Sequence, residues 1–254
     1  MIHSKRHGEI LRLLGEEGTI TIASLAERLG VSLETVRRDV RPLTDDGTIL
    51  KMHGAVSLPF LSGEAPFERR MRENAEAKRL ITRMVAATIR DGESIMLDTG
   101  TTTSFLAREL LGHRRLTVVT NSSDIARTLS TVNGNRVYMA GGELRSDSGA
   151  AFGVSAIDFI GRFSVSHAVI SIGAVDALTG LMDYDLEEAE FARTVLSRGQ
   201  RSLVITDHTK FGRQGLVRVC GFDGFSELAT DQPPPPDIAA ALGQAGARLS
   251  VAAA

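Results

Sequence analysis

Residues 31–39 spell V-S-L-E-T-V-R-R-D and set two adjacent arginines just after the start of a short amphipathic segment. Val36, Val40 and Leu43 recur at spacings of four and three, the period of a helix with one buried face. The opposite face then carries polar side chains, namely Glu34, Thr35, Arg37, Arg38 and Arg41. The segment is therefore constrained to be the outer helix of a small helical domain.

Two shorter helical patterns precede this segment, and they predict a helix-turn-helix. Apolar residues recur at helical spacing in both, at Ile10, Leu13 and Leu14, then at Ile22, Leu25, Ala26 and Leu29. Thr21 and Ser32 are predicted N-caps, and Gly30 supplies the sharp turn between the second and third helices. After Asp46-Gly47, residues 48–54 alternate like one arm of a hairpin, which predicts a wing bearing Lys51 and His53.

An exposed helix with three arginines suits the DNA major groove, where arginine donates two hydrogen bonds to guanine or binds a phosphate. Ser32 and Thr35, at the helix N-terminus, are placed to reach phosphates or base edges. The alternative is a helical protein-interaction module whose arginines are only solvated. Residues 1–57 hold eight Lys or Arg and eight Asp or Glu, so overall charge does not decide, but the clustering on one helix favours DNA.

The motif V-S-L-E-T-V-R-R-D-V-R-P-L at 31–43, together with K-M-H-G-A at 51–55, resembles the DNA-binding domain of the DeoR family of bacterial repressors. The resemblance implies that Ser32, Thr35, Arg37 and Arg38 contact DNA. Arg41, Lys51 and His53 join them as candidates from the outward face and the wing. One departure is Ala55, because the family often has two glycines after the wing histidine.

Composition fits a soluble two-domain regulator. The chain has 254 residues, 43% of them hydrophobic, and lacks an 18-residue apolar run, so we expect neither a membrane span nor export. Its single cysteine, Cys220, suits a reducing cytoplasm. The net charge of -2 argues against indiscriminate coating of nucleic acid. The six histidines show no paired metal spacing, so we expect no metal and no cofactor.

We expect four regions. These are a winged helix-turn-helix at 1–57, a linker and the start of a connecting helix at 58–74, an α/β domain at 75–231, and a Pro/Ala-rich tail at 232–254 that forms a capping helix or a disordered end. The connecting helix is predicted to run from Phe67 to Ile89. Beyond it, apolar runs alternate with helical patterns, with strands at 94–98, 116–120, 136–140, 167–172 and 202–206 and helices at 104–111, 123–131, 154–163 and 187–198. Such strands form a parallel sheet covered on both faces, which binds ligands at the carboxyl ends of its strands.

Small and polar residues follow these strands. Residues 98–103, D-T-G-T-T-T, outline a phosphate cradle at a helix N-terminus, although a capped helix start is the plain alternative. Neither a Walker A loop nor a G-x-G-x-x-G fingerprint is present, so nucleotide binding is not implied. The other ends carry Thr120-Asn121-Ser122, Gly141-Gly142-Glu143, 171–173 and 206–210. This mixture suits a sugar phosphate, although Asn121 alone can be a helix cap, Gly141-Gly142 a turn, and Asp207 with Lys210 a surface pair.

The resemblance continues through F-E-R-R-M-R-E-N at 67–74, D-T-G-T-T-T, T-N-S, G-G and D-H-T-K-F-G at 207–212, which are similar to successive signatures of the DeoR-type sensor domain. It implies a Rossmann-like, ribose-5-phosphate-isomerase-like α/β domain that senses phosphorylated sugars. The implied effector contacts are Asp98, Thr99, Gly100, Thr101, Thr102, Thr103, Asn121, Gly142, Asp207 and Lys210, with Glu187 and Glu188 as weaker candidates.

The sequence therefore predicts a DNA-binding repressor of a carbohydrate-metabolism operon, controlled by a phosphorylated sugar or a related metabolite. Its expected partners are double-stranded operator DNA and further copies of itself, as a dimer or tetramer. The alternative is an isomerase-like enzyme with an accessory DNA-binding domain, and the carboxylates available to it are Asp176, Asp183, Asp185, Glu187 and Glu188. The fused DNA-binding domain favours binding over catalysis, so we expect no catalytic residues.

Overall fold

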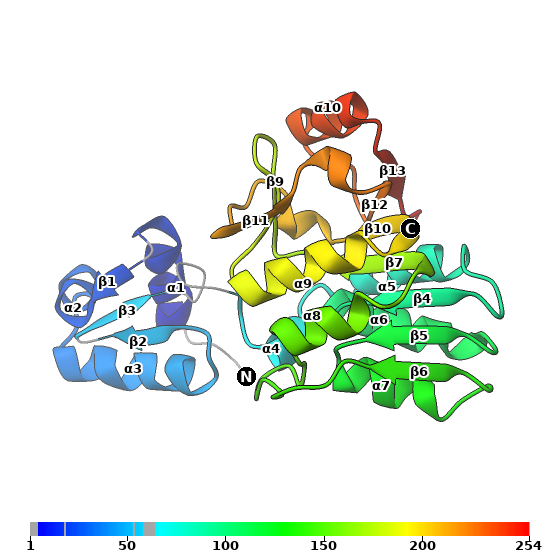
Figure 1. The fold of residues 1–254 in the computed structure, drawn as a ribbon. Coiled ribbons are helices and arrows are strands. Elements are labelled where there is room, and N and C mark those ends of the chain that lie inside the picture. The colour runs from blue at the N-terminus through cyan, green and yellow to red at the C-terminus, as the bar shows by residue number, and fades with distance from the viewer. Residues whose placement is uncertain (1–4, 18, 53, 58–63, 254) are drawn as a thin grey trace. The chain divides into compact units, whose positions relative to one another are not determined.

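The structure is a computed structural model that describes residues 5–17, 19–52, 54–57 and 64–253. The chain forms two compact units, residues 1–66 and 67–254 (Figure 1). Within the described residues, no helix is both long and apolar enough to cross a membrane.

The first unit is a winged helix-turn-helix, as predicted. Its helices are α1 (Lys5–Glu17), α2 (Ile22–Leu29) and α3 (Leu33–Asp45), and its antiparallel sheet has the order β1-β3-β2, with β1 (Thr19–Thr21), β2 (Leu50–Met52) and β3 (Ala55–Ser57). Thr21 Oγ1 accepts a hydrogen bond from the Ser24 N–H at 3.1 Å and so caps α2. Gly30 takes φ 62°, the left-handed turn that ends this helix.

The core of this unit joins the three helices to the wing. Its completely or almost completely buried residues include Leu14 of α1, Leu25 of α2 and Val36 of α3, packed with Ile49 and Val56 from the wing. The apolar face of α3 is therefore turned inward. This leaves the arginines of α3 on the outer side.

The second unit is built on a seven-stranded parallel sheet with the order β13-β12-β10-β7-β4-β5-β6. The strands are β4 (Ser94–Leu97), β5 (Thr117–Thr120), β6 (Arg136–Met139), β7 (Val165–Ser171), β10 (Gly199–Ile205), β12 (Glu227–Thr230) and β13 (Arg248–Val251). A small antiparallel sheet, β11-β9-β8, lies beside it, with β8 (Ala174–Asp176), β9 (Gly180–Asp183) and β11 (Val217–Cys220).

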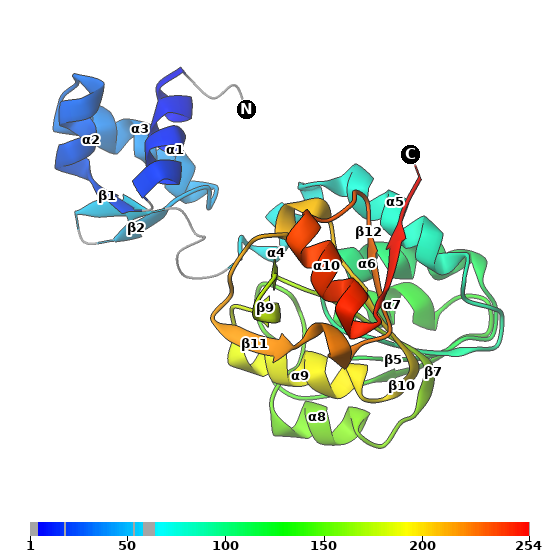
Figure 2. The same cartoon turned by 90° about the horizontal axis from the view of Figure 1, so that it is seen from above.

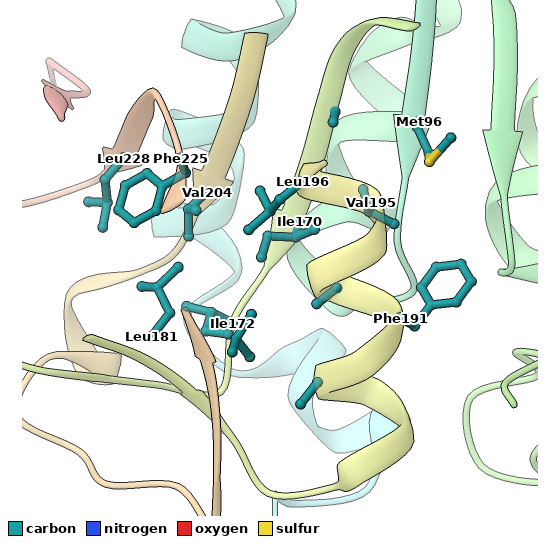
Figure 3. Close-up of a cluster of buried hydrophobic side chains, with 14 of the residues drawn as sticks. Met96, Ile170, Ile172, Leu181, Phe191, Val195, Leu196, Val204, Phe225 and Leu228 are labelled. Atoms are coloured by element: carbon teal, nitrogen blue, oxygen red, sulfur yellow. The ribbon is translucent and has the colours of Figure 1, made fainter. Parts of the chain in front are cut away.

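Helices cover both faces of the large sheet (Figure 2). Alternate strand residues divide between two cores, because successive side chains of a strand point to opposite faces. Met96 and Val204 pack with α8 (Val154–Ile160), α9 (Leu186–Leu196) and α10 (Pro236–Ala245), as Figure 3 shows for α9. Leu97 and Leu203 pack with α5 (Ala75–Ala86), α6 (Thr101–Glu109) and α7 (Ser123–Ser130). The remaining helical elements are α4 (Phe67–Arg72) and the short 3-10 helices η2 (Leu110–Gly112), η3 (His208–Lys210) and η4 (Phe222–Gly224).

The chain reverses its direction of travel through the sheet between β4 and β7. From β4 it passes to β5 and β6 on one side, then returns to β7 on the other side and continues to β10, β12 and β13. In parallel sheets such a reversal opens a crevice at the carboxyl ends of the two strands. The ends of β4 and β7 therefore locate the candidate ligand site.

Two expectations need correction. The pattern from Phe67 to Ile89 is not one helix, because Asn74 takes the left-handed conformation at φ 51° and separates α4 from α5. Asparagine tolerates this conformation better than most residues, so a break can occur without glycine or proline. For the tail, the helix alternative holds and the disordered end is wrong, since α10 packs on the sheet and β13, which was not predicted, forms the edge of the sheet.

Candidate functional site

The outer face of α3, called the reading face below, presents most of the predicted DNA contacts. Arg37, Arg38 and Arg41 are exposed on it. Arg37 lies 3.6 Å from Glu34, and Arg41 lies 4.0 Å from Asp45. Arg38 makes no ion pair with any residue that the structure describes, so its guanidinium can meet DNA without leaving a carboxylate.

The start of α3 fixes Ser32 and Thr35 in place. Ser32 Oγ accepts a hydrogen bond from the Thr35 N–H at 3.2 Å and lies 2.9 Å from Thr35 Oγ1. The cap thus holds both hydroxyls at the helix N-terminus, where the helix dipole favours a phosphate. On the wing, Lys51 is exposed on β2, whereas His53 lies outside the described residues.

Sequence reasoning missed an ion pair behind the reading face. Asp39 is buried on the inner side of α3, and its Oδ2 accepts a hydrogen bond from Arg6 Nε of α1 at 2.7 Å. The pair ties the first helix to the middle of the reading helix. No local pattern could have revealed it, because the partners are 33 residues apart.

At the β4–β7 crevice, Asp98 bridges the two strands. Both of its carboxylate oxygens accept from the Ser171 N–H at 3.2 Å. Burial raises the pKa of Asp98 well above its ordinary value, and the carboxylates of Asp183 and Glu188 raise it further. Gly100 is required beside it, because a Cβ there would lie 1.8 Å from Ser171 Oγ. The crevice therefore brings backbone and a carboxyl group into close contact with little room for side chains.

The next turn is the segment that the sequence predicts to be a phosphate cradle. Thr101, Thr102 and Thr103 are buried in the first turn of α6, and no side chain caps this helix. Thr103 Oγ1 donates to the Gly100 carbonyl at 3.0 Å, whereas Thr99 Oγ1 is buried with no partner among the described residues. The simple alternative of a capped helix start is not what the structure shows. Uncapped N–H groups at a helix start favour an anion.

Asn121 and Gly142 follow the next two strands along the same edge. Asn121 is fully buried, and its Nδ2 donates to the Ala151 carbonyl at 2.9 Å. Its Oδ1 has no partner among the described residues, so the side chain can accept a hydrogen bond from a ligand. Asn121 does not cap α7, because Ser122 does. Gly142 is exposed at φ 149°, a conformation that other residues rarely adopt.

On the other side of the crevice, Asp207 is a buried carboxylate and not a surface group. Its Oδ1 accepts from Asn74 Nδ2 at 3.2 Å, from the Thr209 N–H at 3.1 Å and from Thr209 Oγ1 at 2.5 Å. Lys210 is half-buried one turn later in η3. The predicted effector contacts thus follow four of the five adjacent strands β10-β7-β4-β5-β6 along one edge of the sheet, and β7 ends there at Ser171, which binds Asp98.

The loop after β6 adds an arginine that sequence reasoning missed. Arg145 donates to Asp185 at 2.8 Å, Glu187 at 2.7 Å and Glu188 at 2.8 Å, and its guanidinium carbon lies 4.2 Å from the ring centroid of Phe152. Arg145 and Phe152 line a hollow of about 560 Å³. The two glutamates proposed as weaker effector contacts therefore hold this arginine.

A buried lysine is the second residue that the sequence did not indicate. Lys78 of α5 is only 3% exposed, and its Nζ donates to the carbonyls of Arg70 and of Glu73, the latter at 2.9 Å. Burial lowers its pKa to about 8, against the opposing influence of Asp207, and Lys210 lowers it further. Within the described part of the chain, no group of three or more His, Cys, Asp or Glu side chains is arranged to hold a metal ion.

Comparison with known proteins identifies the family. The DeoR-like helix-turn-helix domain matches residues 6–59, and the DeoR C terminal sensor domain matches residues 73–232. The chain belongs to the DeoR family. The DeoR-family glycerol-3-phosphate regulon repressor of Escherichia coli (strain K12) is 33% identical over 238 residues, which cover 94% of this chain and 94% of that protein.

Other relatives and structures extend the comparison. The HTH-type transcriptional repressor CsqR of E. coli (strain K12) is 35% identical over 230 residues, covering 91% of this chain and 88% of that protein. A crystal structure of ribose 5-phosphate isomerase A from Neisseria gonorrhoeae aligns with 54% of this chain and 53% of its own, at 14% identity and a TM-score of 0.39. We draw no argument about function from this structural likeness. The DeoR domains agree with the winged helix-turn-helix and the α/β sensor architecture.

Proposed function

We propose that this DeoR-family regulator represses a carbohydrate-metabolism operon and that a phosphorylated sugar or polyol controls its binding to operator DNA. The observation that carries the sensing role is a set of unused polar groups at the carboxyl ends of β4 and β5, beside the β4–β7 reversal. There, an uncapped helix start, the buried Thr99 hydroxyl and the buried side-chain oxygen Oδ1 of Asn121 offer hydrogen-bonding groups that have no partner among the described residues. The near full-length similarity to a glycerol-3-phosphate regulon repressor supports a small organic phosphate as the effector.

The α6 start is suited to the phosphate of such an effector, and the carboxyl and amide groups are suited to its hydroxyls. Lys210 adds a mobile positive charge. Neighbouring strands lie about 4.8 Å apart, so the row from Asp207 to Gly142 spans about 19 Å, more than one pentose phosphate can cover. We therefore place the effector between Asp98 and Asn121, with Lys210 reaching towards it from one side.

On DNA, we propose that two copies of the reading face enter successive major grooves from a symmetric oligomer. Ser32, Thr35 and Lys51 would contact phosphates, and Arg37 or Arg38 would choose bases. Effector binding would favour a subunit arrangement whose reading faces no longer match the two half-sites. This requires the effector to bind that arrangement more tightly, because equal affinity shifts nothing.

The sensing role is tested by thermal-shift measurements against sn-glycerol 3-phosphate, ribose 5-phosphate, glucose 6-phosphate and the matching unphosphorylated compounds. We expect one phosphorylated compound to raise the melting temperature of the full chain, because a ligand that binds the folded state stabilises it. The same compound should change the affinity for an operator selected by the protein from random DNA. Stabilisation by the unphosphorylated compounds alone would contradict the proposal.

A binding role without turnover agrees with the contacts of the carboxylates available to an isomerase. Asp176 accepts from the N–H groups of the turn that follows it, and Asp185 caps α9 and binds Arg145. Glu187 and Glu188 bind the same arginine. Incubation of the protein with pentose and hexose phosphates should therefore yield bound ligand and no isomerised product. Formation of product would make the enzyme alternative correct.

A further inference from the structure

The loop that carries Asp207 and Lys210 also holds the first helix of the sensor unit. Asn74, between α4 and α5, donates from Nδ2 to Asp207 Oδ1 and to Thr209 Oγ1, each at 3.2 Å. These partners are 133 and 135 residues away along the chain. The left-handed backbone of Asn74 turns the chain sharply here, and its amide ties that turn to the effector loop.

Lys78 fastens the same turn from the inside. Its buried ammonium donates to the carbonyl of Arg70 in α4 and to that of Glu73 just after α4. The groups that face Lys78 electrostatically are Asp207, Lys210, Arg70 and Glu73. The buried amine of Lys78 thus binds the carbonyls at the end of α4 and interacts electrostatically with Asp207 and Lys210 of the effector loop. We call residues 70–78 the elbow.

Helix α4 also packs against α6, the helix whose first turn carries Thr101–Thr103. It is also the first element of the sensor unit after the segment that leads from the DNA-binding unit. A six-residue helix that packs on α6 and is followed by a turn bound to the loop at 207–210 is placed to respond to an effector at these strand ends.

We propose that the elbow transmits effector binding to the DNA-binding function of this repressor. Asn74 is a positioning residue, which through Asp207 and Thr209 holds α4 in the position that it has when the protein can bind DNA. The proposal rests on the proposed function of the crevice. When an anionic effector draws Lys210 towards the α6 start, the loop at 207–210 shifts and the Asn74 amide loses its acceptors. The turn then loosens, and α4, the first helix of the sensor unit, loses its fixed position on that unit.

The test compares Asn74→Gly with Asn133→Gly in the full chain. Glycine keeps the left-handed backbone free of strain and removes only the amide. Asn133 is a matched control, since it is also left-handed, at φ 51°, and also donates two hydrogen bonds from Nδ2, to Leu111 and His113 carbonyls. We expect Asn74→Gly to speed amide hydrogen exchange in residues 69–78 about fivefold or more, while Asn133→Gly leaves that segment unchanged.

Operator binding gives the second measurement. Without any ligand, Asn74→Gly should bind the selected operator at least about threefold more weakly than wild type, and Asn133→Gly should match wild type. Wild-type exchange in 69–78, or faster exchange with wild-type operator affinity, would overturn this role of the elbow. If no phosphorylated compound binds the wild-type protein, the proposed effector fails, yet these ligand-free measurements still decide the role of the elbow.

Discussion

Replacing Arg38 by alanine should weaken operator binding more than replacing Arg37. Arg38 is exposed on the reading face without an ion pair among the described residues, whereas Arg37 lies 3.6 Å from Glu34. A bidentate arginine–guanine contact is worth about 1–3 kcal/mol per half-site. Two half-sites give about 2–6 kcal/mol, or a loss of affinity of about 30-fold to about 10⁴-fold. Arg37 must break its ion pair with Glu34 before it can contact DNA. This lowers the contribution of Arg37 to operator binding only slightly, because such an exposed pair is worth at most about 1 kcal/mol.

Fluorescence anisotropy with the selected operator, over about 0.05 to 0.3 M salt, separates the two kinds of contact. A lost phosphate contact lowers the slope of log K against log salt by about 0.9 per half-site, hence about 1.8 for a dimer. A lost base contact leaves the slope nearly unchanged and relaxes the preference for one base pair. We expect the second result for Arg38→Ala.

Arg90→Ala is the matched control, since it removes one exposed arginine from the second unit with the same change of charge. It should leave both the affinity and the slope at wild-type values. If Arg38→Ala also binds within about twofold of wild type at every salt concentration, α3 does not use Arg38 to read DNA, and the reasoning from its exposure is wrong.

Three further predictions concern the second unit. Thr101→Ala and Lys210→Ala should each weaken binding of the phosphorylated effector, by about tenfold or more for Lys210→Ala, while operator affinity is retained. If calorimetric titration shows wild-type effector affinity for either variant, the residue replaced in that variant is not part of the site. Gly100→Ala should lower the free energy of unfolding, measured by urea denaturation, by about 1–3 kcal/mol, because the new Cβ would clash with Ser171. The double variant with Ser171→Gly should recover most of this stability. An unchanged free energy of unfolding in Gly100→Ala would contradict the close packing of Gly100 on Ser171. The pKa of Lys78 is about 8 in the folded protein, against an ordinary value of 10.5. Between these two pH values the unfolded chain binds one proton more than the folded protein. The free energy of unfolding of the wild type should therefore rise with pH in this range relative to that of Lys78→Met, by at most about 1.4 kcal/mol per pH unit. A difference that stays flat from pH 8 to 10 would contradict the burial of a charged amine.

The sequence predicted the fold where the pattern is local. The three helices of the first unit, their caps at Thr21 and Ser32, and five of the seven parallel strands follow from apolar periodicity and capping chemistry. β12 and β13 were missed, because they flank the Pro/Ala-rich stretch, whose composition suggests a tail. The break at Asn74 was missed because neither glycine nor proline marks it.

For the candidate site too, the residues marked by a local sequence pattern were predicted and the others were not. Polar residues that directly follow strands were found, because the parallel sheet brings all strand ends to one edge and the signal needs only the strand boundaries. Arg145, Lys78 and the Arg6–Asp39 pair were not found. The partners of Arg145 lie up to 43 residues away and Arg6 and Asp39 are 33 residues apart, so only the assembled fold brings them together. The partners of Lys78 are only five and eight residues away, but they meet it because of the turn at Asn74, which was itself missed.

The contribution of the elbow to the coupling free energy between effector and operator binding can be bounded from its hydrogen bonds. The two hydrogen bonds of Asn74 are worth about 0.5–1.5 kcal/mol each, so breaking both supplies about 1–3 kcal/mol, a coupling of about fivefold to 150-fold. Moving an operator from 99% occupied to 1% requires about 5.5 kcal/mol of differential effector affinity. Asn74 alone therefore cannot produce a complete switch. The rest must come from contacts that change together with it, and the structure offers two: the packing of α4 on α6, and the ammonium of Lys78 on the last carbonyls of α4. A relay of this kind responds as a unit, so Asn74→Gly should reduce the effector response without abolishing it.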